Sequence, residues 1–103
     1  MTREEFTFTI GFQGDTAIVD KRAKRLYGRL STMELAEKGL YRAAFCSAVF
    51  SGNRQEMDEF IRHFAEKTAS ADPKSGRLES EDQFKRLFGV YTVPDEIKRV
   101  VSL

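Results

Sequence analysis

Every second residue from 6 to 12 is apolar, and small or polar residues stand between them. The apolar members are Phe6, Phe8, Ile10 and Phe12. A period of two is typical of a strand with one buried face. We therefore expect a strand over residues 6–12.

A tight turn follows this strand at Gly14 and Asp15. Glycine at the first central position favours a two-residue hairpin turn, so the chain should reverse here and form a second strand. A hairpin alone is unstable in water, so helices or another copy of the chain must complete it. The expected register brings apolar residues together on one face, pairing Phe12 with Ala17 and Ile10 with Val19.

Residues 20–30 could form a loop or a short helix, and their helical spacing favours a helix that ends near Gly28. Its inward side would carry Ala23, Leu26, Tyr27 and Leu30. The next segment begins with Ser31 and Glu34, a capping box that marks a helix start. A single helix is expected from there to about Ser51, the central and most buried one, since residues 40–50 are almost entirely apolar.

Three further helices are predicted in the rest of the chain. Gly52 ends the central helix and Asn53 caps the next one, with an apolar stripe at Met57, Phe60, Ile61 and Phe64. Residues 70–79 are expected to form an exposed loop. Ser80 and Gln83 then cap a helix with Phe84, Leu87 and Phe88 that Gly89 ends. A final helix should start at Pro94 and turn Ile97, Val100 and Val101 inward.

These elements predict an α+β fold, mostly α, in which an N-terminal β-hairpin packs against about four helices. At 103 residues the chain should form a single small globular domain over residues 1–103. The one Cys and one His exclude an internal disulfide and a Cys/His zinc site. A polar first segment and the lack of a long apolar stretch predict no secretory signal and no membrane contact, so we expect a cytoplasmic protein.

The sequence offers few candidate catalytic residues. His63 has Glu59 one helical turn before it and Lys67 one turn after it, which could form a base oriented by a carboxylate or an ordinary surface ion network. Cys46 lies in the most apolar segment, where a thiol is typically inert. The glycine pair at 11 and 14 fits a turn better than a phosphate loop, and Glu79, Glu81 and Asp82 suit a helix start. We expect no enzyme, no metal site and no cofactor.

A basic run gives one binding hypothesis, despite a net charge of only +1. If residues 21–29 are helical, four cations share one stripe able to contact phosphates or an acidic surface: Lys21, Arg22, Arg25 and Arg29. The other interpretation is a solvated helix face. A nucleic-acid-binding regulator that uses segment 21–29 is therefore the alternative function.

A second nucleic-acid signal lies in residues 35–52. Gly39, Leu40 and Tyr41 followed by Ala44 and Ala48 resemble the turn and recognition helix of Cro-type helix-turn-helix repressors. The motif wants a small residue where this chain has Leu35, and the segment offers few donors to read bases. The competing interpretation is the continuous buried helix, in which Gly39 allows close packing.

The aromatic load favours protein binding. The chain has nine Phe and three Tyr, and so short a chain should leave some of their rings at the surface, where a cluster would mark an interface. The other interpretation is that all of them pack in the core. The edge of the first strand could also pair with another chain. The leading hypothesis is a small non-catalytic interaction or regulatory module that binds another protein or forms a homo-oligomer. Its predicted contact residues are Phe6, Phe8 and Phe12.

Overall fold

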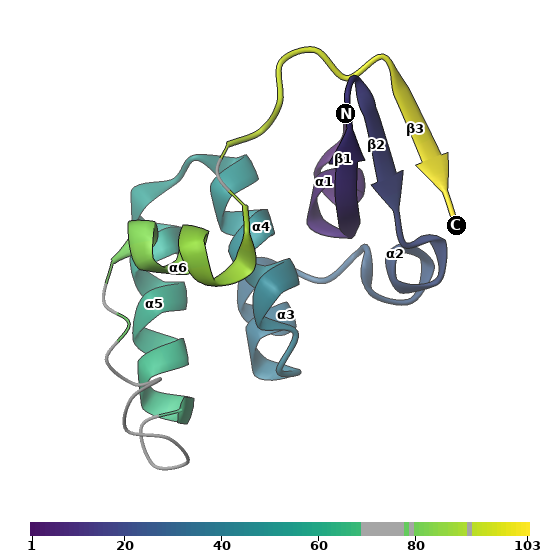
Figure 1. The fold of residues 1–103 in the computed structure, drawn as a ribbon. Helices are drawn as coiled ribbons and strands as arrows, with labels where there is room; N and C mark the ends of the chain where they lie inside the picture. Colours follow the sequence, from purple (N-terminus) through teal and green to yellow (C-terminus); the bar gives the residue numbers. More distant parts are fainter. Residues whose placement is uncertain (69–77, 79, 91) are drawn as a thin grey trace.

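A computed structural model describes residues 1–68, 78, 80–90 and 92–103. Over these residues the chain is a mostly helical α+β protein with a three-stranded sheet and six helices. The sheet lies at one end of the molecule, whereas the longest helix and its neighbours lie at the other (Figure 1). The predicted fold class, including the N-terminal hairpin, is confirmed.

The chain begins with a helix, not a strand. Helix α1 covers Arg3–Thr7 and starts with a capping box between Thr2 and Glu5. The prediction of a strand from residue 6 is therefore wrong, because the cap begins a helix that carries Phe6 into the core. The Phe6 ring lies 6.0 Å from the ring of Phe50 between centroids.

The hairpin forms where it was predicted, but its register slips at one end. Strands β1 (Thr9–Gln13) and β2 (Thr16–Val19) are antiparallel, and Gly14 has φ 62 in the turn between them. Phe12 pairs with Ala17 as expected. The pairing of Ile10 with Val19 is wrong, because a β-bulge brings Thr9 opposite Val19 and leaves Ile10 58% exposed.

A short helix forms within residues 20–30, as the spacing indicated. Helix α2 covers Lys21–Tyr27, with the Asp20 side chain accepting from the backbone N–H of Ala23 and Gly28 at the C-cap. No residue of α2 itself is buried, and Leu26, which was expected inward, is 55% exposed. The helix therefore covers the core only partly.

The predicted helix from 31 to 51 is in fact two helices. Helix α3 (Thr32–Glu37) begins with the expected Ser31–Glu34 capping box, and helix α4 (Tyr41–Ser51) begins after a break at Gly39, whose φ is 79. The N–H of Gly39 donates to the carbonyl oxygen of Ala36, and the N–H of Leu40 donates to that of Leu35. This pair of bonds is a Schellman motif, which ends α3 and turns the chain.

The predicted caps of the next two helices are confirmed. Helix α5 (Arg54–Thr68) has the Asn53 side chain as acceptor for the N–H of Glu56, and helix α6 (Glu81–Phe88) has a capping box at Ser80. Phenylalanines from α4, α5 and α6 form the centre of the core, with Phe45, Phe60, Phe64 and Phe84 all buried. The loop predicted over residues 70–79 lies almost wholly outside the described residues.

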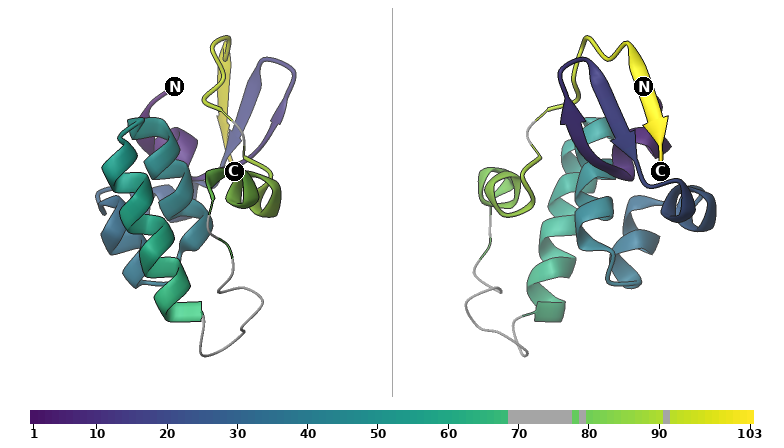
Figure 2. Two further views of the ribbon diagram at one scale, coloured as in Figure 1. Left: turned by 90° about the vertical axis from the view of Figure 1, so that its left-hand side faces the viewer. Right: turned by 45° about the vertical axis from the view of Figure 1, so that its right-hand side comes forward.

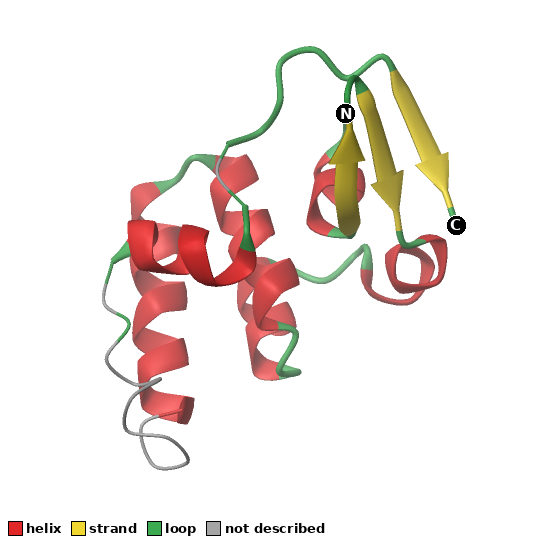
Figure 3. Cartoon of the chain, in the orientation of Figure 1, coloured by secondary structure: helices red, strands yellow, loops and turns green. Residues whose placement is uncertain are grey.

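The end of the chain is a strand where a helix was predicted. Strand β3 (Arg99–Ser102) runs parallel to β2 and completes the sheet in the order β1-β2-β3 (Figure 3). β-Branched Val100 and Val101 favour a strand, and β2 offers its unpaired side to them. Pro94 thus precedes an extended segment, and the expected inward placement of both valines is wrong because their side chains are exposed.

Candidate functional site

The predicted base and carboxylate do not form a pair. His63 and Glu59 line a shallow hollow with Met33, Arg62 and Glu66, but Glu59 accepts a hydrogen bond from Gln55. The Nε2 atom of His63 is buried without a hydrogen-bond partner among the described residues. A histidine that no carboxylate orients lacks the arrangement of a general base.

Cys46 is enclosed in the core. Burial raises the pKa of its thiol to about 11, although the positive charge of Arg42 acts in the opposite direction. A protonated thiol that solvent does not reach is a poor nucleophile and metal ligand. In the described part of the chain, no group of three or more His, Cys, Asp and Glu residues is placed to hold a metal ion.

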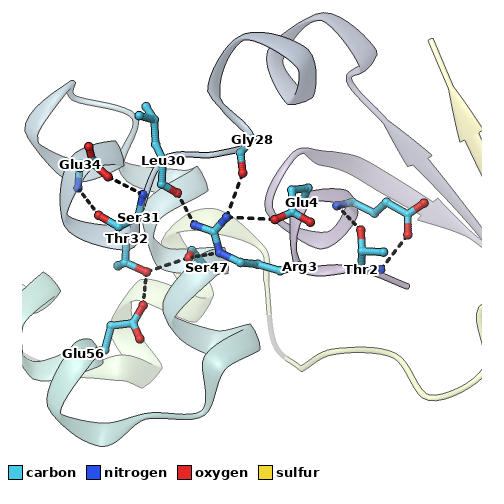
Figure 4. A network of polar contacts seen from close by, with 11 residues as sticks. Thr2, Arg3, Glu4, Gly28, Leu30, Ser31, Thr32, Glu34, Ser47 and Glu56 are labelled. Carbon is cyan, nitrogen blue, oxygen red and sulfur yellow. Dashed lines mark hydrogen bonds and ion pairs between the residues drawn. The ribbon is translucent and has the colours of Figure 1, made fainter.

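A chain of polar side chains links four helices through the interior (Figure 4). The Arg3 guanidinium donates to the hydroxyl of Ser47 at 3.0 Å and to the carbonyl oxygens of Gly28 and Leu30 at 3.1 and 2.5 Å. The Ser47 and Thr32 hydroxyls are 2.7 Å apart, and Thr32 also bonds to the Glu56 carboxylate.

The charges at its two ends orient this chain of hydroxyls. Each hydroxyl carries one hydrogen, so the arrangement that satisfies every group has Ser47 donating to Thr32 and Thr32 donating to the Glu56 carboxylate. Ser47 is 1% and Thr32 3% exposed, so no substrate reaches either hydroxyl. We assign the network a structural role, in which it fixes α1, α3, α4 and α5 relative to one another.

An open groove of about 510 Å³ lies between β1, α2 and the start of α4. Its walls are mainly apolar, with Ile10, Ala23 and Leu40 among them. Its one guanidinium, that of Arg42, is already bonded to the carbonyl oxygens of Thr9 and Phe88 at 2.6 and 3.4 Å. The charged group of Arg42 is therefore already used by the chain itself.

Two of the three predicted contact residues are buried. Phe6 and Phe8 are only 1% and 7% exposed, so a partner cannot reach their rings in this structure. Phe12 is 45% exposed and stays a candidate contact residue. The exposed edge of β1 is also not fully open, since Arg42 occupies the Thr9 carbonyl.

Strand β3 has an open edge instead. All four of its residues are exposed, including Val100 and Val101. The N–H of Arg99 donates to the carbonyl oxygen of Asp15 at 3.3 Å, and the N–H of Leu103 donates to that of Val19 at 3.0 Å. Because backbone groups alternate in direction along a strand, residues 99, 101 and 103 face β2.

The same alternation turns the backbone groups of Val100 and Ser102 away from β2. Within the described residues no other strand lies on that side of β3, and Figure 2 shows β3 at the rim of the sheet. The edge therefore offers two N–H groups and two carbonyl oxygens beside exposed valine side chains, a surface suited to pairing with another strand. Sequence reasoning missed this edge because it placed both valines on a helix, although their β-branching was a signal for a strand.

The predicted basic stripe is exposed and lies at one end of this edge. Lys21, Arg22, Arg25 and Arg29 are all exposed on or just after α2, and no ion pair among the described residues joins them to a carboxylate. The backbone N–H of Lys21 donates to the carbonyl oxygen of Leu103 at 3.1 Å. The basic helix is thus fixed at the C-terminal end of β3 (Figure 1).

The structure has the turn of a helix-turn-helix motif but not its exposed recognition helix. Gly39 breaks the chain between α3 and α4 as such a turn requires, yet α4 is buried along its middle, from Ala44 to Ala48. A recognition helix must present that surface to a DNA groove. Helix α4 is instead the core helix that the apolar pattern predicted.

Comparisons with protein families, curated proteins and solved structures found no match to this chain. Across the described segments, no helix combines the length and apolar character that a membrane crossing needs.

Proposed function

We propose that this chain is a non-catalytic protein-binding module that takes up a strand of its partner along the open edge of β3. The single observation that carries the proposal is the state of β3, a strand paired on one side whose four residues are all exposed. Natural proteins usually cover or charge such edges to prevent pairing. Here the middle of the edge carries two valines.

Strand addition suits this edge for a physical reason. The backbone groups of Val100 and Ser102 supply four hydrogen-bonding positions to an incoming chain, and the flanking side chains select its residues. Phe12 pairs with Ala17, which in turn pairs with Val100, so the side chains of these three residues lie on one face of the sheet. Contact with a partner could therefore extend from the edge onto this face.

The experiment uses a proline at the edge. Val100→Pro removes an N–H that does not bond to β2, so the sheet should remain folded while the edge loses one donor and gains a bulky ring. Val100→Thr is the matched control because it keeps the donor and the β-branched shape.

A library of random peptides displayed on phage supplies the probe. Peptides enriched on the wild-type chain should bind Val100→Thr with similar affinity and lose at least tenfold in affinity for Val100→Pro, with unchanged circular dichroism in both variants. Enriched peptides that bind all three proteins equally, or no enrichment at all, would overturn the proposal.

A second candidate is the nucleic-acid-binding function, favoured by four exposed cations at residues 21–29 that form no ion pair with any described residue. It predicts affinity for duplex or single-stranded DNA that falls steeply as salt rises. Arg22→Glu combined with Arg25→Glu should abolish that binding, and the absence of binding at low salt would exclude this function.

A further inference from the structure

We infer that the partner strand at the β3 edge is an extended, partly apolar peptide that carries acidic residues at the end lying against α2. This inference rests on the proposed function and adds the chemistry of the ligand. The sequence left two possible partners open, another protein or a second copy of the chain. The charges around the β3 edge decide between them.

A second copy would have to pair β3 with β3 in a defined register. In an antiparallel pair the outward residues hydrogen-bond to each other. The register that uses both outward residues of each copy pairs Val100 with Ser102 of the other copy and places Val101 opposite its counterpart. This arrangement brings Arg99 opposite Leu103 of the second copy. Leu103 is bonded to the backbone of Lys21, at the start of the basic helix.

In this register self-pairing brings Arg99 of each copy toward the basic helix α2 of the other copy, at both ends of the paired strands. Arg99 of each copy would approach Lys21 and Arg22 of the other, and each of these side chains is exposed. Like charges that face each other across a pair of strands are destabilising. With only four exposed residues in the edge strand, little apolar burial is available to offset this repulsion.

With an acidic peptide, the interaction between the added strand and helix α2 becomes attractive. Carboxylates at one end of the added strand would lie beside α2, where Lys21, Arg22 and Arg25 have no partner among the described residues. Apolar residues in the middle of the peptide would contact Val100 and Val101. Complementary charge would also fix which end of the peptide lies toward α2 and raise its association rate.

Two synthetic peptides test the inference. Both alternate valine and threonine, and they differ only in carrying two glutamates or two lysines at one end. The glutamate peptide should bind the wild-type chain at least tenfold more tightly at low salt, and the difference should shrink at high salt. Arg22→Glu with Arg25→Glu should abolish or invert this preference.

The matched control is Arg62→Glu with Lys67→Glu. It makes the same change in net charge on exposed positions of α5, away from the sheet. The control variant should keep the preference for glutamate, because the preference depends on local charge and not on net charge.

The outcomes separate the inference from the proposed function. If both peptides bind equally and Val100→Pro abolishes both, the edge binds strands but the acidic partner is wrong. A dimer in sedimentation that Val100→Pro dissociates would replace the acidic peptide with a second copy. Binding of the glutamate peptide that survives Val100→Pro, or salt-dependent DNA binding with no peptide binding, would overturn strand addition itself.

Discussion

The Arg42 guanidinium donates to the carbonyl oxygen of Thr9 at 2.6 Å, where strand β1 bulges. This bond joins helix α4 to the sheet and occupies a backbone acceptor at the edge of β1. It leaves β3 as the edge of the sheet that is open along its whole length within the described residues. One side chain of the core helix therefore leaves the edge of β1 less open than the edge of β3.

Replacing this arginine should destabilise the fold. Arg42→Met keeps much of the apolar stem but leaves the carbonyl oxygens of Thr9 and Phe88 without their donor, which should cost about 1–3 kcal/mol in the free energy of unfolding. Arg86→Met on the exposed side of α6 is the control and should change stability by less than about 0.5 kcal/mol. Urea denaturation measures both, and equal values would show that the bond to Thr9 contributes nothing.

The interior hydroxyl chain makes a separate prediction. Thr32→Val preserves shape but removes the donor to Glu56 and the acceptor for Ser47, with an expected loss of about 1–3 kcal/mol. Combining it with Ser47→Ala should give a coupling energy of about 0.5–3 kcal/mol in a double-mutant cycle, because the two hydroxyls are in contact. Additive single effects would contradict the connected network of Figure 4.

Cys46 should make stability fall in alkaline solution. Burial raises the pKa of its thiol from 9.0 to about 11. The folded protein therefore holds this proton more tightly than the unfolded chain, and the stability that it contributes is complete below pH 9 and is lost as the pH rises toward 11.

The measurement compares the wild-type chain with Cys46→Ala. The free energy of unfolding of the wild type should decline more steeply between pH 9 and pH 11, by a total on the order of 2–3 kcal/mol. Tyrosine and lysine titrations are common to both proteins and cancel in the difference. Parallel curves would mean that the thiol is not buried in solution.

The break between α3 and α4 depends on glycine at position 39. Its φ of 79 lies in the left-handed region, so Gly39→Ala should destabilise the protein by about 1–2 kcal/mol. Gly11 has open space around its Cβ position and no positive φ, so Gly11→Ala is the control and should be close to neutral. Thermal unfolding compares them, and equal melting temperatures would indicate a helix that continues through Gly39.

Local signals in the sequence predicted most of the helical structure. Serine and asparagine caps at Ser31, Asn53 and Ser80 and glycine ends at Gly52 and Gly89 all lie where they were expected, because each acts on backbone groups within one turn of itself. The buried positions Met57, Phe60 and Phe64 of α5 also followed from their helical spacing.

Predictions were wrong where two short-range signals favoured different structures, or where the structure depends on contacts between segments far apart in the sequence. Alternation over residues 6–12 competed with the Thr2–Glu5 cap, and the cap decided the start of the chain. At Gly39 the apolar run on both sides favoured one continuous helix, although a glycine able to adopt positive φ permitted the turn.

The sequence by itself determined the fold class, the caps of α5 and α6, the glycine ends of α4 and α6, and a basic segment at residues 21–29. Only the tertiary structure decided that the last residues form a strand, that Thr9 replaces Ile10 in the hairpin register, and that the open edge belongs to β3. Each of these depends on backbone bonds between segments far apart in the chain, such as Arg99 with Asp15, or on a side chain such as Arg42 that arrives from another helix. Spacing along the sequence carries no information about such partners, so the open edge of β3 could be recognised only from the pairing of β2 with β3.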